Sequence, residues 1–226
     1  MTLLALIPAR SGSTRLPGKN LRMLAGKPML AWTVEAAVEA ARFAAVYVST
    51  DDEEIATCAR AHGADVIMRP SALATDESPI ELTIEHASSL WDRWHSGWKG
   101  AMLLNPTSPC RTTETIRYAC SQLDYDPRVV GVREAGAAHF RGKVTESGWW
   151  AADYEERVRT QDAKRFVENG ALYGWLSVCR GTPLPPHQPC RAVVMSAQES
   201  VDVDTVHDHD VASVVMRKRL EGKVVV

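Results

Sequence analysis

The stretch LLALIPARSGSTRLPGKN, residues 3–20, joins five apolar residues to a loop rich in cations, glycines and hydroxyls. A short continuous apolar run is typical of a parallel strand that is buried on both faces. Ligands of open parallel sheets bind beyond the carboxyl ends of the strands, and this loop begins at such an end. The stretch therefore predicts an α/β fold with a ligand-binding loop after its first strand.

The rest of the chain alternates strand-like and helix-like patterns. Further strands are predicted at 45–49, 66–68, 101–104, 128–132, 171–178 and 192–195, and helices at 29–42, 52–61, 80–94, from 112 onward, and 207–220. This alternation favours a mainly parallel sheet flanked by helices. Residues 134–165 are irregular and rich in charge, so we expect a single domain over 1–226 with one insertion at about 134–165.

The loop after the first strand has the composition of a phosphate site. Glycines permit close approach of the backbone, and Arg10, Arg15 and Lys19 supply charge for phosphate oxygens. A solvated basic turn is the alternative. Five residues separate Gly12 from Gly18 and Lys19 precedes Asn20, so the Walker pattern is not met, and no G-x-G-x-x-G occurs. The sequence predicts a phosphate loop of another kind.

The segment SVDVDT, residues 200–205, places two acids near the end of the chain. In an extended conformation Asp202 and Asp204 lie on the same face, because side chains alternate with period two. Adjacent carboxylates are hard oxygen ligands that suit Mg²⁺. A polar turn with Asp204 or Thr205 as the cap of the last helix is the alternative.

A third polar segment, Asn105–Arg111, follows the strand at 101–104 and contains two prolines. Its amide and hydroxyls offer hydrogen bonds to a polyol. The acids and histidines of residues 207–210 are better explained as the first turn of the last helix than as a zinc site, because no third ligand stands at suitable spacing.

The bulk composition excludes some partners. The net charge of -2, with 45% hydrophobic and 24% charged residues, gives no basic surface for nucleic acid or an anionic membrane. The five cysteines are scattered, as in reduced cytosolic proteins. Neither a signal peptide nor an apolar run of membrane-spanning length is found, so we expect a cytoplasmic protein.

Seven segments, in order, resemble the acylneuraminate cytidylyltransferases, the CMP-sialic acid synthetase family. They are IPARSGSTRLPGKN (7–20), GKPMLAWTVEAA (26–37), VYVSTDDEEIA (46–56), GADVIMRPSALATD (63–76), NPTSPCRT (105–112), NGALYG (169–174) and SVDVDT (200–205). The resemblance implies a Rossmann-like nucleotidyltransferase fold. It also implies Mg²⁺, CTP as donor, and a nonulosonic or related 2-keto-3-deoxy sugar acid as acceptor, with pyrophosphate as product.

The expected site residues follow from these segments. Arg10, Arg15, Lys19 and Asp202 are expected to be catalytic, and Asp202 and Asp204 to bind the metal. We expect the nucleotide to be held by Ala9, Arg10, Ser11, Gly12, Ser13, Lys19, Asn20 and Arg69, and the acceptor by Asn105, Thr107, Ser108, Arg141, Arg159 and Asn169. Lys143 and Arg165 are further candidates for the acceptor's carboxylate, although a solvated surface position explains these insertion cations equally well. Members of the family are usually dimers, and the insertion at 134–165 is the segment expected to form the contact.

Three departures from the family pattern affect the expected substrate. Ser13-Thr14-Arg15 is more similar to the first loop of CMP-Kdo synthetases, and Asn105 stands where a longer Gln is usual. Val167-Glu168 replaces the usual Arg-Pro, so an acid stands where the family offers the acceptor a cation. This favours a modified acceptor, such as one that bears an amine.

Two other functions remain open at this point. One is a nucleotidyltransferase with a different nucleotide, such as GTP, or with a non-sialate acid as acceptor. The other is a catalytically inactive homologue that binds nucleotides.

Overall fold

The computed structural model describes residues 2–135, 142–144, 150–152, 165–179 and 190–222. Its main sheet has seven strands in the order β11-β7-β10-β6-β1-β4-β5. Four consecutive strands, up to the edge strand β5 (Asp65–Met68), are β6 (Gly100–Leu104), β1 (Leu3–Pro8), β4 (Phe43–Thr50) and β5 itself. They pair in parallel, and β11 (Arg191–Met195) pairs in parallel with β7 (Arg128–Ala135). The predicted Rossmann-like nucleotidyltransferase fold, with a mainly parallel sheet flanked by helices, is confirmed.

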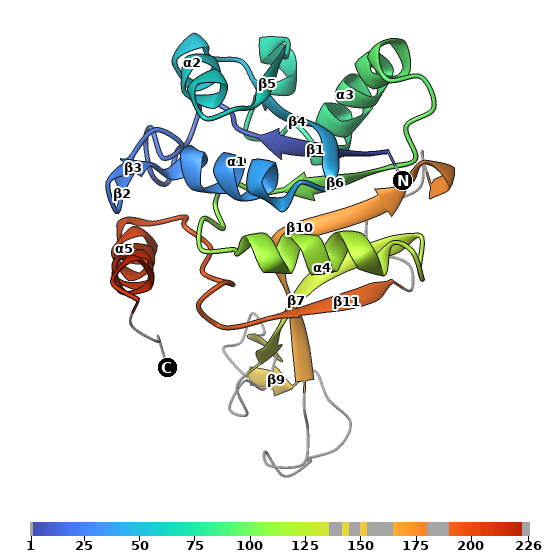
Figure 1. Cartoon of the computed structure of the whole chain (residues 1–226). Helices are drawn as coiled ribbons and strands as arrows, with labels where there is room; N and C mark the ends of the chain where they lie inside the picture. Colours follow the sequence, from blue (N-terminus) through green and yellow to red (C-terminus); the bar gives the residue numbers. More distant parts are fainter. Residues whose placement is uncertain (1, 136–141, 145–149, 153–164, 180–189, 223–226) are drawn as a thin grey trace.

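Both faces of the sheet are covered by helices (Figure 1). On one face, Leu3, Ala5 and Ile7 of β1 pack in a core shared with α1 (Met29–Ala40), α2 (Glu53–Ala61) and α4 (Thr113–Gln122). On the other face, Leu4 and Leu6 pack with α3 (Ile80–Trp94). Because alternate side chains of β1 enter different cores, every position of this strand must be apolar, which explains its unbroken apolar run.

Polar side chains cap the first turns of three helices. Asp52 accepts a hydrogen bond from the backbone N–H of Ile55 at the start of α2, at 2.9 Å. Thr112 caps α4, and Thr205 forms a reciprocal capping box with Asp208 at the start of α5 (Val206–Leu220). Each cap satisfies an amide that the first helical turn leaves without a partner. The interpretation of Thr205 as a cap is therefore confirmed.

One strand runs against the direction of its neighbours. β10 (Arg165–Leu176) is antiparallel to both β6 and β7, and it starts six residues before the predicted strand at 171–178. Antiparallel pairing needs no helical crossover, so the chain returns from β7 to β10 through the insertion instead. The insertion was expected to be irregular, but it contains a hairpin of β8 (Gly142–Val144) and β9 (Trp150–Ala152). The hairpin lies near the end of β7 and the start of β10 (Figure 1).

Four smaller elements were not predicted from the sequence. They are the β2–β3 hairpin (Met23–Leu24 and Lys27–Pro28) and the 3-10 turns η1 (Ser71–Leu73) and η2 (Ser177–Cys179). Residues 201–204, for which the sequence analysis considered an extended conformation, do not pair with another segment as a strand. No helix in the described part of the chain has the length and apolar character that crossing a membrane requires.

Candidate functional site

A cleft of about 500 Å³ opens at the carboxyl ends of β1, β5 and β6. Eight of the predicted site residues line it, namely Arg10, Ser13, Arg15, Lys19, Asn20, Arg69, Asn105 and Thr107. The lining also includes Thr75, Asp76 and Ser78, which the sequence analysis did not identify. The first loop and the segment after β6 therefore meet in one concave site, as the position rule for parallel sheets predicts.

The first loop folds back on its own strand. Gly18 has φ of +65°, a conformation that costs glycine little, and it lies in a tight turn in which the N–H of Lys19 donates to the carbonyl of Leu16 at 3.2 Å. The Asn20 side-chain amide donates to the Arg10 carbonyl at 2.9 Å. These bonds close the loop, so that Arg10 and Lys19 are held at its two ends.

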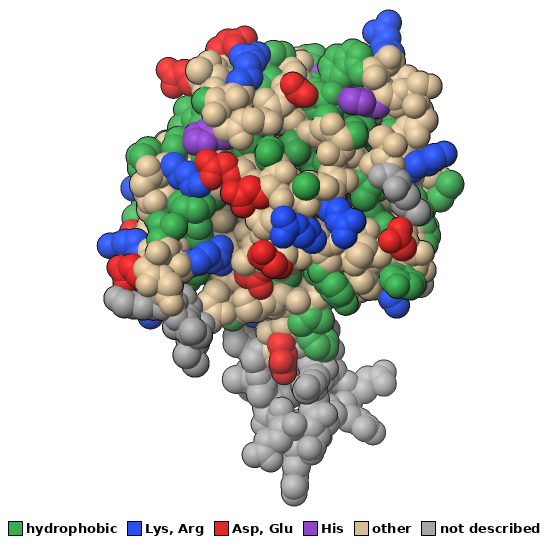
Figure 2. Space-filling view, viewed as in Figure 1, with side chains coloured by type: hydrophobic (Ala, Val, Ile, Leu, Met, Phe, Trp, Pro, Cys, Tyr) green, Lys and Arg blue, Asp and Glu red, His purple; other side chains and the backbone are tan. Residues whose placement is uncertain are grey.

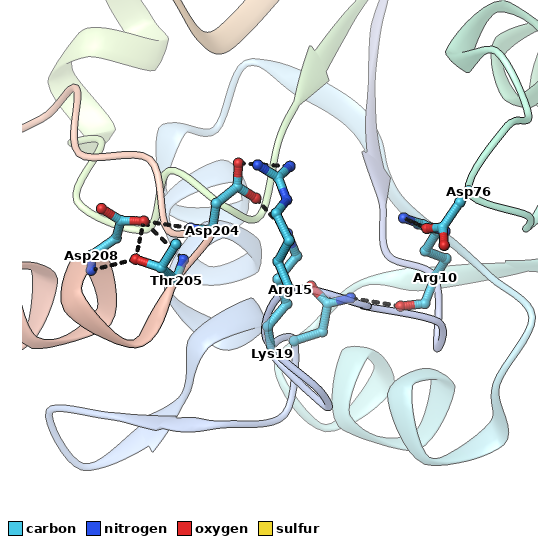
Figure 3. A network of polar contacts seen from close by, with 8 residues as sticks. Arg10, Arg15, Lys19, Asp76, Asp204, Thr205 and Asp208 are labelled. Carbon is cyan, nitrogen blue, oxygen red and sulfur yellow. Dashed lines mark hydrogen bonds and ion pairs between the residues drawn. The ribbon is translucent and has the colours of Figure 1, made fainter.

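The cations of the first loop meet the acidic segment near the end of the chain. Lys19 Nζ lies 3.0 Å from Asp204 Oδ1, and an Arg15 guanidinium nitrogen lies 2.9 Å from Asp204 Oδ2 (Figure 3). The side chains of Lys19 and Asp204 are 19% and 24% exposed, whereas that of Arg15 is 70% exposed. The convergence of the two segments, which the sequence predicted, is present in the structure.

A small apolar core explains why these segments meet. Leu16 and Val203 are both buried in a cluster that also contains Cys110 and apolar residues of α5. The N–H of Val203 donates to the Thr107 carbonyl at 2.7 Å. Because Leu16 lies between Arg15 and Lys19, and Val203 between Asp202 and Asp204, burying the apolar residues brings the charges of both segments to one edge.

Asp202 lies next to this ion-pair group but has a different environment. Burial raises the pKa of its carboxyl above the usual value, although part of the side chain is open to solvent. A hydrogen bond from the Thr107 side chain opposes this shift in pKa, and the charge of Asp204 reinforces it. Two carboxylates therefore stand close together, in contact with Lys19 and Thr107 of the cleft lining.

The acidic segment is anchored just before Asp202. The Glu199 carboxylate accepts hydrogen bonds from Thr112, Thr115 and Ser196, at 2.7 Å, 2.5 Å and 2.9 Å from the three hydroxyls. Burial opposes ionisation of Glu199, but these bonds outweigh it and lower its pKa. The Asn169 amide donates to the Ser200 hydroxyl at 2.9 Å. Helix α4 and strand β10 thus fix the segment that carries both aspartates.

A second acid holds the other side of the first loop. Asp51 follows β4 and accepts hydrogen bonds from the Ser11 N–H at 3.0 Å and the Ser11 hydroxyl at 2.7 Å. Burial opposes ionisation of Asp51, but the bonds from Ser11 lower its pKa overall. Arg69 is 7% exposed and donates to Thr83 at 2.8 Å, and burial lowers the pKa of its guanidinium. Asp51 and Arg69 therefore link the first loop to β4 and α3.

Some predicted residues are buried beside the cleft. Ala9 is fully buried and its N–H donates to the Ser49 carbonyl, and Ser108 is also fully buried. Asn169 is 9% exposed and its amide bonds to Ser200, which gives it a positioning contact. Gly12 stands next to the Arg10 side chain, where a Cβ would lie 3.9 Å from Nη1. Arg141 and Arg159 lie outside the described residues, as do the side chains of Lys143 and Arg165.

Charges of both signs lie side by side over the face drawn in Figure 2. Cleft cations have acidic neighbours from other elements: Arg15 and Lys19 pair with Asp204, and Arg10 pairs with Asp76. Within the described residues no group of three His, Cys, Asp or Glu side chains is arranged to hold a metal. The site thus combines three cations with two neighbouring carboxylates.

A cationic loop and paired acids at the carboxyl edge of such a sheet define a protein of the nucleotidyltransferase class. The model of the cytidylyltransferase family matches residues 4–165, and the chain belongs to this family. The chain is 45% identical over 120 residues to the CMP-N,N'-diacetyllegionaminic acid synthase of Legionella pneumophila, a match that covers 53% of this chain and 52% of that protein. It is 44% identical over 114 residues to the N-acylneuraminate cytidylyltransferase of Escherichia coli, covering 50% of this chain and 26% of that protein.

The matches thus span about half the length of the first relative and about a quarter of the second. Among solved structures, a CMP:2-keto-3-deoxy-manno-octonic acid synthetase complexed with CTP is similar with a TM-score of 0.73 and 19% identity, covering 97% of this chain and 100% of that one. A 4-diphosphocytidyl-2C-methyl-D-erythritol synthase from Anaerococcus prevotii is similar with a TM-score of 0.63 and 10% identity, covering 96% of this chain and 98% of that one. At these identities the structures establish the fold alone.

Proposed function

We propose that the protein transfers CMP from CTP to the anomeric hydroxyl of a nonulosonic or related 2-keto-3-deoxy sugar acid and releases pyrophosphate. The observation that carries the proposal is that Lys19 and Arg15, which line the cleft, pair with Asp204. This contact supports the proposal because nucleotidyl transfer needs cations that can bind phosphate beside carboxylates that can bind a metal. Membership of the cytidylyltransferase family and the printed activities of the two relatives support the donor and the class of acceptor.

In this proposal the first loop binds the triphosphate. Arg10 and Lys19 hold phosphate oxygens and stabilise the charge that accumulates on the leaving pyrophosphate, and Arg15 adds charge from the solvent side. Asn20 and Asp51 keep the loop in shape through their bonds to Arg10 and Ser11. Arg69, buried between Thr83 and Asp51, orients the nucleoside end of the cleft. The chemistry then depends on positioning more than on covalent catalysis.

The carboxylates fit a magnesium ion. Mg²⁺ is usually bound by one or two carboxylates together with substrate phosphates, and Asp202 and Asp204 provide such a pair. Both oxygens of Asp204 pair with cations, so binding the ion requires one of these pairs to be exchanged. When bound, Mg²⁺ would neutralise phosphate charge and polarise the phosphorus centre. In this proposal the acceptor lies on the side of Asn105 and Thr107. The Asn105 side-chain amide donates to the Gly170 carbonyl at 2.7 Å and the Thr107 side chain bonds to Asp202, so a sugar hydroxyl would share or replace these partners.

The insertion supplies the remaining parts of the proposal. We assign the single domain to residues 1–226 and a homodimer contact to the insertion at about 134–165, where Arg141 and Arg159 would approach the acceptor. Light scattering coupled to size exclusion tests the dimer, and a monomer at micromolar concentration would contradict it. We place the protein in the cytoplasm, where CTP is available.

The test of function is a pyrophosphate-release screen of four nucleoside triphosphates against nonulosonic and Kdo-type acids, with Mg²⁺ and with EDTA. We expect turnover with CTP and with one class of sugar acid, and none with EDTA. Turnover with GTP instead would identify a different donor. Tight CTP binding without pyrophosphate release from any acceptor would indicate an inactive homologue.

Glu168 is the residue that favours an altered acceptor. It lies on β10, is exposed, and accepts a hydrogen bond from the Tyr173 hydroxyl. Burial first, and then this bond and the charge of Glu168, raise the pKa of Tyr173, so the phenol stays protonated as a donor. The negative charge of the Glu168 carboxylate would attract the positive charge of an amine, so we expect an acceptor that bears one. If N-acetylneuraminate proves the best substrate in the screen, this part of the proposal is wrong.

A further inference from the structure

The cleft contains a second cation–acid pair, and the proposed function gives a role to its cation but none to its acid. An Arg10 guanidinium nitrogen pairs with Asp76 Oδ1, and both residues line the cleft. Figure 3 shows this pair apart from the group formed by Arg15, Lys19 and Asp204. Arg10 follows β1, whereas Asp76 belongs to the connection between β5 and α3, so the pair joins two separate loops.

The loop that carries Asp76 is held together by its own bonds. The Thr75 and Ser78 hydroxyls are 2.7 Å apart, and the Ser78 hydroxyl donates to the Ala72 carbonyl at 3.1 Å. The N–H groups of Ala74 and Ser78 donate to the carbonyls of Ser71 and Thr75. These bonds define the turn without Arg10. The Asp76 side chain can therefore leave Arg10 while the loop keeps its shape.

The pair is also exposed enough to be exchanged. The side chain of Arg10 is 33% exposed and that of Asp76 is 49% exposed. Exposed ion pairs contribute little net stability, because water and salt screen them. Like a carboxylate, a tetrahedral phosphate group can accept two parallel hydrogen bonds from the guanidinium through two of its oxygens, and it carries more negative charge. Asp76 and a phosphate thus compete for the same face of Arg10.

We propose that Asp76 is a specificity-determining residue whose carboxylate occupies Arg10 in the ligand-free protein and is replaced there by a phosphate group of the nucleotide. An anion gains Arg10 only if it displaces Asp76, so weakly charged anions bind poorly. The inference rests on the proposed function in one respect, that the cleft binds a polyphosphate. It adds an exchange that sets the affinity and selectivity of that binding.

The experiment compares Asp76→Asn with wild type and with Glu77→Gln. Glu77 is the next residue of the same loop, is exposed, and does not line the cleft, so Glu77→Gln removes the same charge without freeing Arg10. Binding of inorganic tripolyphosphate and of CTP is measured by calorimetry at two ionic strengths. Thermal melting verifies that each variant is folded.

For Asp76→Asn we expect both ligands to bind about two- to fivefold more tightly than to wild type, the range that an exposed ion pair contributes. The gain should shrink at high salt, and Glu77→Gln should remain close to wild type. An affinity of Asp76→Asn equal to that of Glu77→Gln, or weaker than wild type, would overturn the proposal. If wild type binds tripolyphosphate but no nucleotide, the proposed function fails while the tripolyphosphate comparison still decides the role of Asp76. Failure of every protein to bind either ligand would overturn both.

Discussion

The two cation–acid groups of the cleft differ in how the fold holds them. Asp204 is between Val203, which is buried, and Thr205, which caps α5, and its partner Lys19 is 19% exposed. Asp76 lies on a surface loop, and its partner Arg10 is 33% exposed. Charge at the Asp204 end is therefore fixed by packing, whereas charge at the Asp76 end is open to exchange. The Asp204 group suits a role in the reaction step, which needs side chains in fixed positions. The Asp76 group suits a role in the entry of the ligand.

The largest contrast is expected between Asp202→Asn and Asp76→Asn, the same substitution at the two ends. Asp202→Asn should lower kcat/KM for pyrophosphate release by about 10²- to 10³-fold, as loss of one group that stabilises transition-state charge does. The Mg²⁺ titration should shift to higher concentration. Asp210→Asn, at an exposed position of α5, serves as the control. A Mg²⁺ titration identical to that of wild type would show that Asp202 does not bind the metal.

Lys19→Met should have the next largest effect. The substitution removes the half-buried partner of Asp204 and a phosphate contact together, so we expect kcat/KM to fall by about 10- to 100-fold. Arg22→Met, at an exposed position of the same loop, should stay within about twofold of wild type. Steady-state kinetics with varied CTP measures both variants. Equal losses in the two variants would indicate a general charge effect in place of a specific role for Lys19.

Glu199→Gln tests whether the segment that carries Asp202 and Asp204 depends on the hydrogen bonds of Glu199. It should lower the free energy of unfolding by about 1–3 kcal/mol at pH 7, because hydrogen bonds to a charged acceptor are weakened. The pKa of Glu199 is lowered in the folded state, so its contribution is complete above its usual value of 4.5. The contribution is lost as the pH falls through the lower folded pKa.

Urea unfolding at pH 7 and in acid below pH 4.5 measures this difference. The gap between wild type and Glu199→Gln should narrow in acid. Glu114→Gln is the control, because its side chain is 78% exposed at the start of α4 and its removal should change stability little at either pH. A gap that stays constant from neutral to acid pH would contradict the role given to the Glu199 carboxylate.

Arg15→Met should lower kcat/KM less than Asp202→Asn and Lys19→Met do. Arg15 pairs with the same carboxylate as Lys19, but its side chain is 70% exposed, so solvent screens its charge. We expect kcat/KM to fall by less than about fivefold, with an effect that decreases as salt is added. A loss as large as that of Lys19→Met would mean that Arg15 moves into the cleft when the nucleotide binds.

Several parts of this protein were predictable from local sequence. The apolar run Leu3–Ile7 indicated a strand buried on both faces, and its alternate residues enter two separate cores. The polar loop that follows lines the cleft, because ligand sites lie at the carboxyl ends of parallel strands. Thr205 caps the last helix, one of the two positions that the sequence offered for that cap. These features depend on residues that are close together in the chain, so the spacing of apolar residues and the position of capping residues are enough to predict them.

Other parts were not predictable, because they depend on contacts between distant segments. The antiparallel direction of β10 depends on the path of the insertion, which has no periodic pattern. Asp76 is an ordinary loop acid until β5 and β1 bring it to Arg10. Glu199 resembles a surface residue in the sequence, yet it accepts hydrogen bonds from Thr112 and Thr115, more than eighty positions earlier. A partner that far along the chain leaves no local signal.

The sequence alone determined the kinds of group at the site: cations and glycines in the first loop, and two acids spaced by one apolar residue near the end. Tertiary structure decided which of them meet. Leu16 and Val203 are buried in one small core, and their burial places Lys19 against Asp204 and leaves Asp202 beside the pair. The physical reason is that apolar burial depends on the shape of the whole molecule, whereas the identity of a charged group is local.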